Sequence, residues 1–357
     1  MPPLSSRVLE RPTPKVTIQK LAMPTPPPRA TPAPIPASRA PFRLLSVLLR
    51  WESILALLLL GTMLLGGRLS PYFWDPFNLG DSTTTFSEKG LIALSMALLI
   101  LVREIDLSVA AIIALSSLGM GLAAAQGMGA WSLAAVGLLI GVLCGLFNGL
   151  LVIRFRVPSI VVTIGTLSLF RGIAQGTLGD GALTQYPPAF AQFGQSYAFT
   201  YLPLEFVAFC ALALVFGLVL HRTLWGRWLY ALGHSLEGAR FSGIPVDRLR
   251  LTLFALSGLM SGLAAVFLTS RISSTRPNIA LGWELDVVTM VILGGVAIAG
   301  GSGSILGVFL SVITLGMALF AMSLLNIPGI VTTVLVGALL IVVLAIPRVV
   351  AKMTRRG

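Results

Sequence analysis

The sequence predicts an all-α integral membrane protein with about ten transmembrane helices. Of its 357 residues, 56% are hydrophobic and only 11% are charged, and the mean hydropathy is +0.92. Soluble domains carry about 25% charged residues. The apolar residues also gather in runs close to the roughly 20 residues that a helix needs to cross a bilayer. A soluble globular domain is therefore excluded.

The formal net charge is +12, and most of the basic residues lie near the two ends or in short loops between apolar runs. In a soluble protein such an excess would indicate nucleic acid. In a membrane protein it follows from the enrichment of lysine and arginine in cytoplasmic loops and from their attraction to anionic lipid. We expect membrane lipid, and not nucleic acid, as a partner.

Both ends of the chain are expected on the cytoplasmic side. Residues 1–41 are proline-rich and carry more bases than acids, so we expect a disordered tail. A dispensable extension, or a start codon placed too far upstream, is favoured over a docking role. Residues 42–349 form the predicted transmembrane domain, and 350–357 form a basic tail.

Apolar runs and loop charges set the spans. Residues 70–86, with several aromatic side chains, suit the interface opposite the cytoplasm, and 176–203 contain no lysine or arginine, as expected of an external loop. The predicted spans are 45–65, 88–102, 109–125, 131–153, 158–175, 204–220, 249–269, 285–299, 305–325 and 329–346.

Two short segments resemble one another. Residues 157–163 read VPSIVVT and residues 327–333 read IPGIVTT. The first would begin a span from the inside and the second from the outside, as in an inverted repeat. The short match agrees equally with an inverted repeat and with chance similarity.

Ionisable residues interrupt the apolar sequence at Arg103–Ser108. Charges at membrane depth are costly and face protein or water. Asp106 and Ser108 are placed to cap the first turn of the next span by accepting backbone N–H bonds. We favour this role over contact with a transported solute.

Small polar side chains also occur inside the spans. Asn148 lies in the fourth, and Thr163 and Thr166 lie in the fifth. Their groups either bond within the helix bundle or line a weakly polar path, and packing is favoured. Arg171, near the external end, is expected to meet an extracellular partner or lipid headgroups.

Residues 222–250 form a polar, basic loop between two apolar runs. Within it, 226–243 read GRWLYALGHSLEGARFSG, where a short helix would end on Gly243 before Ile244 and Pro245. Its charge places it in the cytoplasm. A patterned helical loop of this kind indicates a docking point for a partner.

This loop resembles the coupling loop of sugar-importing ABC permeases of the ribose/galactose/rhamnose type, within the branched-chain amino acid/ribose-like permease superfamily. Family loops carry a Glu-Ala-Ala core, which here reads Glu237-Gly238-Ala239. Glycine inside a helix costs about 0.5–1 kcal/mol relative to alanine. The resemblance implies ATPase coupling by Gly226, Arg227, Glu237, Ala239, Arg240, Gly243 and Ile244.

Further segments carry the same resemblance across about 45–349, among them EIDLSV at 104–109, the stretch 158–172 and the glycines at 294–303. Residues 269–286 are most similar to rhamnose-type permeases. The resemblance implies a type II-like ABC importer permease in the bacterial plasma (inner) membrane, and it makes Asp106, Ser108, Asn148, Thr163, Thr166 and Arg171 pathway or structural residues.

The implied partners are cytoplasmic ATPase subunits, a second permease subunit that is identical or homologous, and a periplasmic or extracellular sugar-binding protein. The sequence has no G-x-x-x-x-G-K-[ST] phosphate loop, and its cysteines and histidines have no metal-ligand spacing. We therefore expect no cofactor, no metal and no enzymatic activity in this chain, with ATP hydrolysed by a separate subunit.

The alternative is an ion-coupled secondary transporter or channel for a small polar solute. Such proteins place acids in the membrane, and Glu104, Asp106, Glu284 and Asp286 are candidates. The patterned loop and the missing phosphate loop favour the ABC permease.

Overall fold

Helices form almost every regular element of the protein. The computed structural model describes residues 51–338, so the predicted tails at 1–41 and 350–357 lie outside the described residues. The helices are α2 (Trp51–Leu69), η1 (Pro71–Trp74), α3 (Pro76–Leu101), α4 (Val109–Ala125), α5 (Ala130–Phe155), α6 (Ser159–Leu178), α7 (Pro188–Gln195), α8 (Leu204–Arg222), α9 (Leu224–His234), α10 (Leu236–Phe241), α11 (Val246–Ile272), α12 (Trp283–Leu293), α13 (Ile305–Leu324) and Gly329–Ala338. A two-stranded antiparallel hairpin, β1 (Tyr197–Phe199) with β2 (Leu202–Pro203), precedes α8.

Seven helices within residues 51–338 are long and apolar enough to cross a membrane, namely α2, α3, α5, α6, α8, α11 and α13. Helix α4 and the helix at Gly329–Ala338 are apolar but shorter. The all-α membrane fold is thus confirmed, whereas the count of ten spans stays a prediction.

Helix α3 begins much earlier than predicted. The sequence placed its start near Glu88 and assigned 70–86 to the membrane interface, but the helix starts at Pro76 and most residues of 80–87 are buried. Asp75 caps it by accepting the N–H groups of Phe77 and Asn78 at 3.0 Å. The hydroxyls of its first half bond back to carbonyls three or four residues earlier, so polar residues remain in a buried helix.

Helix α12 is shorter than the predicted span at 285–299, because it ends at Leu293 after 11 residues. Gly295, Gly300 and Gly301 follow with φ near +80°. Side chains other than glycine avoid this backbone conformation, so the glycines turn the chain out of the helix.

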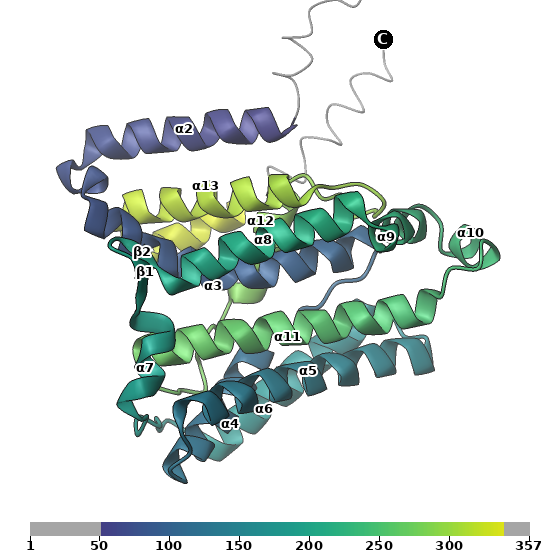
Figure 1. Ribbon diagram of the computed structural model, residues 1–357, viewed down its shortest axis with the longest axis horizontal. Coiled ribbons are helices and arrows are strands. Elements are labelled where there is room, and N and C mark those ends of the chain that lie inside the picture. The colour runs from purple at the N-terminus through teal and green to yellow at the C-terminus, as the bar shows by residue number, and fades with distance from the viewer. Residues whose placement is uncertain (1–50, 339–357) are drawn as a thin grey trace, which may run out of the picture. The chain divides into compact units, whose positions relative to one another are not determined.

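The helices pack in two groups around α11. Figure 1 shows α5, α4 and α6 on one side of α11, and α3, α8, α12 and α13 on the other, with α2 outermost beside α13. Helix α3 is the most deeply buried of the seven membrane-length helices, and α2 is the least buried.

Glycines bring α5 and α11 into backbone contact. A Cβ placed on Gly141 or on Gly258 would collide with the carbonyl oxygen of the other residue, and one on Gly262 would lie 2.8 Å from the Gly137 carbonyl oxygen. Small residues permit this approach between membrane helices. The two halves of the proposed repeat both mark a helix start, since Pro158 precedes α6 and Pro328 precedes the helix at Gly329.

Candidate functional site

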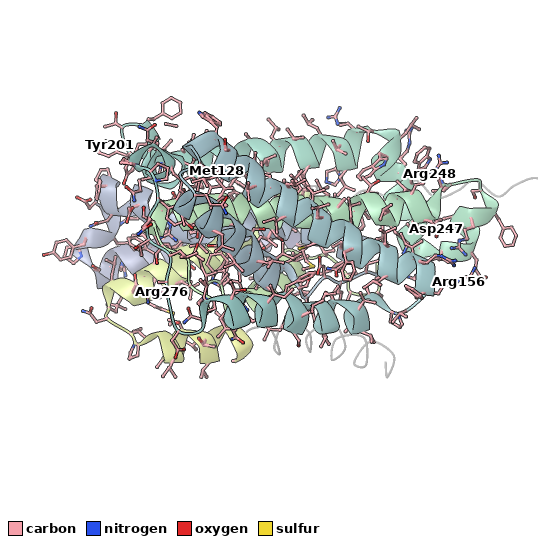
Figure 2. The ribbon with its side chains drawn as sticks, turned by 90° about the horizontal axis from the view of Figure 1, so that it is seen from below. Met128, Arg156, Tyr201, Asp247, Arg248 and Arg276 are labelled. Carbon is pink, nitrogen blue, oxygen red and sulfur yellow. The ribbon has the colours of Figure 1, made fainter. Side chains whose placement is uncertain are left out.

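The loop predicted to dock a partner projects from one end of the bundle as α9 and α10 (Figure 1). Arg156, Asp247 and Arg248 lie at this end, whereas Met128, Tyr201 and Arg276 lie at the opposite end (Figure 2). Loops that the sequence assigned to one side of the membrane therefore share one end of the molecule. We call the end that carries α10 the α10 end.

Helix α10 forms in spite of the glycine at its centre. Ser235 caps it by accepting the N–H of Gly238 at 3.0 Å, and Gly243 follows it with φ +77°. The N–H of Ile244 reaches back to the Ala239 carbonyl oxygen at 3.1 Å. The predicted left-handed glycine after this helix is confirmed.

The predicted coupling residues divide into an exposed and a buried set. Glu237, Arg227 and Arg240 are exposed, and Arg240 pairs with Asp247 at 2.9 Å. Ala239 is buried against the bundle. Gly226 is buried where α9 turns back on Leu220, with no room for a side chain, and Ile244 is half-buried.

Phe241 is the most exposed large apolar side chain of this loop, with 92% of its surface accessible. It ends α10 and faces solvent beyond the bundle. It therefore adds an accessible aromatic group to the surface of α10. Phe241 was not among the predicted coupling residues, because the sequence of an apolar chain does not show which aromatic side chains are exposed.

Arg103 fastens α9 to the bundle. Its Nε and Nη2 donate to the carbonyl oxygens of Gly233 and His234, each at 2.8 Å. Gly301 donates its N–H to the Leu101 carbonyl oxygen beside them, also at 2.8 Å. The charged segment between α3 and α4, residues 102–108, is therefore hydrogen-bonded to the carboxyl end of α9.

The next residues of the break connect to α11. Glu104 forms an ion pair with Arg250 in the first turns of that helix, and both side chains are largely buried. Glu104 thus has a local counter-ion, which gives no support to its role as an ion-coupling acid.

Asp106 is the centre of a buried polar network. It accepts the N–H of Ser108 at 3.0 Å, the Ser108 hydroxyl at 2.6 Å and the Ser257 hydroxyl at 3.0 Å. Asn148 donates to Ser108 at 2.8 Å, and its own Oδ1 has no partner among the described residues. The network joins the start of α4 to α5 and α11.

The predicted cap on α4 is therefore only half right. Asp106 binds one backbone N–H, but the side chain of Ser108 makes no cap and donates to Asp106 instead. Ser257 was missed, because its position 151 residues along the chain from Asp106 gives no sequence signal.

Thr163 and Thr166 are buried in α6, and their hydroxyls bond within the bundle. Thr163 donates to the Ile105 carbonyl oxygen at 3.3 Å, and Ser159 accepts the N–H of Ile105 at 3.1 Å. Thr166 bonds back to Thr163 at 3.4 Å. These contacts support the packing interpretation over a path lining.

Arg171 does not reach toward lipid or an external partner, contrary to prediction. It is buried, and its Nη1 donates to the carbonyl oxygens of Pro277 and Ile279 at 2.8 and 2.7 Å. These bonds hold the loop between α11 and α12 against α6. The prediction was wrong because backbone carbonyl acceptors in a distant loop leave no pattern in the sequence.

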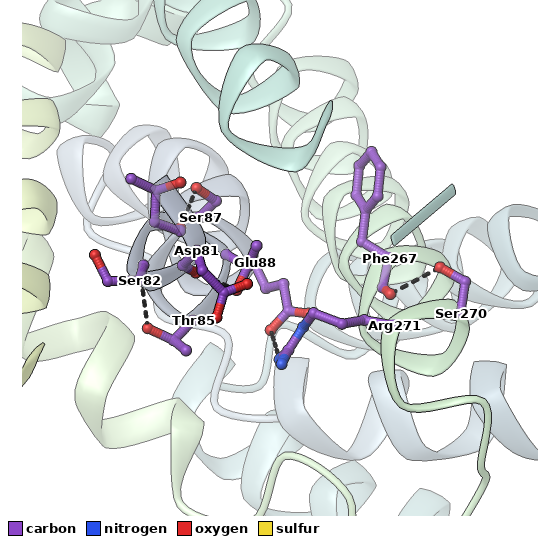
Figure 3. A network of polar contacts seen from close by, with 10 residues as sticks. Asp81, Ser82, Thr85, Ser87, Glu88, Phe267, Ser270 and Arg271 are labelled. Carbon is purple, nitrogen blue, oxygen red and sulfur yellow. Dashed lines mark hydrogen bonds and ion pairs between the residues drawn. The ribbon is translucent and has the colours of Figure 1, made fainter. Parts of the chain in front are cut away.

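A cluster of buried charges lies toward the other end of the molecule. Arg271 grips Glu88 through two bonds of 3.0 Å (Figure 3). Glu205 is fully buried near this pair and Asp81, yet both of its carboxylate oxygens lack a partner among the described residues. Asp286 instead pairs with Lys89 at 2.6 Å.

Tyr186 lies in a connected polar group outside the membrane-length helices. Its hydroxyl contacts Thr275 at 2.6 Å, and Thr275 also contacts Ser117. Burial raises the pKa of Tyr186 to about 12, so the phenol stays neutral at physiological pH. None of the described residues forms a cluster of three or more histidine, cysteine, aspartate or glutamate ligands.

Comparison with known proteins adds two findings. The family described as "Branched-chain amino acid transport system / permease component" matches residues 78–344. The autoinducer 2 import system permease protein LsrD of Klebsiella pneumoniae subsp. pneumoniae is 35% identical over 301 residues, covering 83% of this chain and 90% of that protein. LsrD of Escherichia coli O9:H4 is 36% identical over 299 residues, covering 82% and 90%.

Proposed function

Because this chain belongs to the family of permease components of branched-chain amino acid transport systems, we propose that it forms the membrane path of an ATP-driven importer for a small sugar-like solute. Its similarity over nine tenths of the LsrD proteins carries the proposal. Those relatives are named for autoinducer 2, which makes that solute the first to test. The names of these relatives do not support rhamnose as the transported sugar.

In this proposal α9 and α10 couple the permease to a cytoplasmic ATPase. Phe241 and Glu237 are exposed on α10, so they present an apolar and an acidic group to a partner. Arg103 and the Glu104–Arg250 pair fix the base of the loop, so a push on α10 reaches the break between α3 and α4. A loop without these contacts would move by itself and would not transmit the displacement to the helix bundle.

The remaining partners follow from the transport reaction. A second permease subunit would complete the path, and a periplasmic or extracellular binding protein would deliver the solute to the end opposite α10. This assigns the α10 end to the cytoplasm of a plasma (inner) membrane protein, in agreement with the arginines gathered there.

Ion-coupled transport is the second candidate, and the unpartnered carboxylate of Glu205 is the observation in its favour. Buried acids without partners are typical of proton and cation sites in transporters. Of the acids that the sequence offered for this role, Glu104, Asp106 and Asp286 are paired or hydrogen-bonded. Glu284 has one carboxylate oxygen, Oε2, that is buried without a hydrogen-bond partner among the described residues.

Uptake into proteoliposomes separates the two functions. The chain is reconstituted with its ATPase and binding protein, and uptake of labelled autoinducer 2 and rhamnose is measured with internal ATP or with a proton gradient. We expect uptake with ATP only, and we expect Glu237→Lys to abolish it and to release the ATPase, because the new cation would repel a surface suited to a carboxylate. Uptake driven by the gradient without ATP would refute the proposal.

A further inference from the structure

A basic cavity of about 840 Å³ opens at the α10 end, between the α5–α6 turn, α10 and the start of α11. Its lining residues include four arginines, Arg154, Arg156, Arg240 and Arg250, and five apolar residues, among them Leu150 and Ile153. Asp247 is the single acid among its lining residues. The cavity thus has a strong excess of positive charge.

This charge is not neutralised within the described part of the chain. Asp247 pairs with Arg240, and Glu104 pairs with Arg250. Arg154, in the last turn of α5, and Arg156, just after that helix, take part in no ion pair among residues 51–338. The Nε of Arg250 is buried and has no hydrogen-bond partner there. Guanidinium donors therefore remain available to a ligand.

The chemistry of these groups identifies the ligand class. Arginine presents planar N–H donors that match the oxygens of a phosphate. The four arginines come from the end of α5, the turn after it, α10 and α11, so one phosphate between them would be held from several sides. A buried donor without a partner also costs free energy, which a bound anion would recover.

The apolar wall distinguishes between sources of phosphate. Leu150, on the last turns of a membrane-length helix, is 55% exposed, and Ile153 lies beside it. Apolar side chains next to a basic patch at a helix end match an acyl chain that continues into a headgroup. A free phosphate would leave this wall unused.

We propose that this cavity binds the phosphate of an anionic phospholipid, with the acyl chain along Leu150 and Ile153. Because Arg240 belongs to α10, Arg154 to the last turn of α5 and Arg156 to the turn that follows it, the bound headgroup ties α10 to the helix bundle. The site goes beyond the proposed transport function and depends neither on the solute nor on the energy source.

The test uses the full chain in detergent with short-chain phosphatidylglycerol as the probe and phosphatidylcholine as the neutral comparison. Native mass spectrometry measures the bound lipid and its apparent Kd. The variant Arg154→Gln/Arg156→Gln removes the two unpaired arginines. The matched control, Arg222→Gln/Arg248→Gln, removes two exposed arginines near the same loop that do not line the cavity. Thermal unfolding checks that both variants are folded.

We expect the cavity variant to weaken phosphatidylglycerol binding about thirty-fold, from two lost charge contacts, and to leave phosphatidylcholine binding unchanged. The control should bind phosphatidylglycerol like the wild type. Equal affinity in the cavity variant and the wild type, or an equal loss in the control, would overturn the site. Binding of inorganic phosphate together with no binding of phosphatidylglycerol would overturn the lipid source and retain a site for free phosphate.

Discussion

Arg103 and Gly233 meet through a 2.8 Å hydrogen bond from the guanidinium Nε to the carbonyl oxygen, at the carboxyl end of α9. The last carbonyls of a helix lack partners within it, and a cation there also meets the negative end of the helix dipole. Arg103 itself has φ +69°, a conformation that costs about 1–3 kcal/mol outside glycine. A residue held in this conformation therefore connects α9 to the break between α3 and α4.

Replacing Arg103 tests this connection. Arg103→Ala removes the donors, and Arg103→Gly removes them while suiting the left-handed backbone. Hydrogen bonds from a charged group contribute about 1.5–3 kcal/mol each. We expect both variants to insert into the membrane but to lose most ATPase co-purification and uptake. Wild-type behaviour of Arg103→Gly would show that these side-chain bonds do not transmit coupling.

The glycine after α10 gives a second prediction. Nothing lies within 4 Å of a Cβ placed on Gly243, so Gly243→Val would act through its positive φ alone, at about 1–2 kcal/mol. Gly127 is the matched control, because it has φ +79° and equally open surroundings between α4 and α5. We expect uptake to fall sharply for Gly243→Val and to stay near normal for Gly127→Val. Equal loss in both would indicate a general folding defect.

The partner of Asp106 on α11 gives a third prediction. Ser257→Ala leaves one oxygen of a buried carboxylate without its donor, which costs about 1–3 kcal/mol. Ser261, one turn later, is equally buried but bonds only to the Ser257 carbonyl oxygen within its own helix. The thermal unfolding temperature should fall clearly for Ser257→Ala and much less for Ser261→Ala. The same small shift in both would argue that the network does not stabilise the fold.

Local sequence was sufficient for most helix positions and for the end of α10. Apolar runs bounded by arginines or glycines predicted α5, α6, α8, α11 and α13 closely, because the membrane selects apolar residues directly. Gly243 was predictable because its conformation is a local property. The start of α3 was missed, since hydroxyls that bond their own helix make polar residues acceptable in a buried segment.

Contacts between distant residues were beyond sequence reasoning. Ser257 and Asp106, Arg171 and the Pro277 carbonyl, and Arg271 and Glu88 are separated by 151, 106 and 183 residues. Each pair depends on how helices pack side by side, and a single sequence does not specify that arrangement. Asp106 and Arg171 were therefore recognised as polar residues at the spans, but their partners were not.

Glu205 and Glu88 provide the sharpest test between the two candidate functions. Glu88→Gln would leave Arg271 without its bidentate counter-ion, and breaking a buried pair in this way costs about 3–5 kcal/mol. Glu205 has no donor to lose, so Glu205→Gln removes only a buried carboxylate that lacks a hydrogen bond and lies near the acids Glu88 and Asp81. We expect Glu205→Gln to unfold at the wild-type temperature or above it and to retain ATP-driven uptake, whereas Glu88→Gln loses stability. An ion-coupled transporter that used Glu205 would give the opposite result, a stable Glu205→Gln protein without uptake. Because Gln preserves the shape of Glu, a loss of uptake in a stable variant would identify the titratable group itself as the site of coupling.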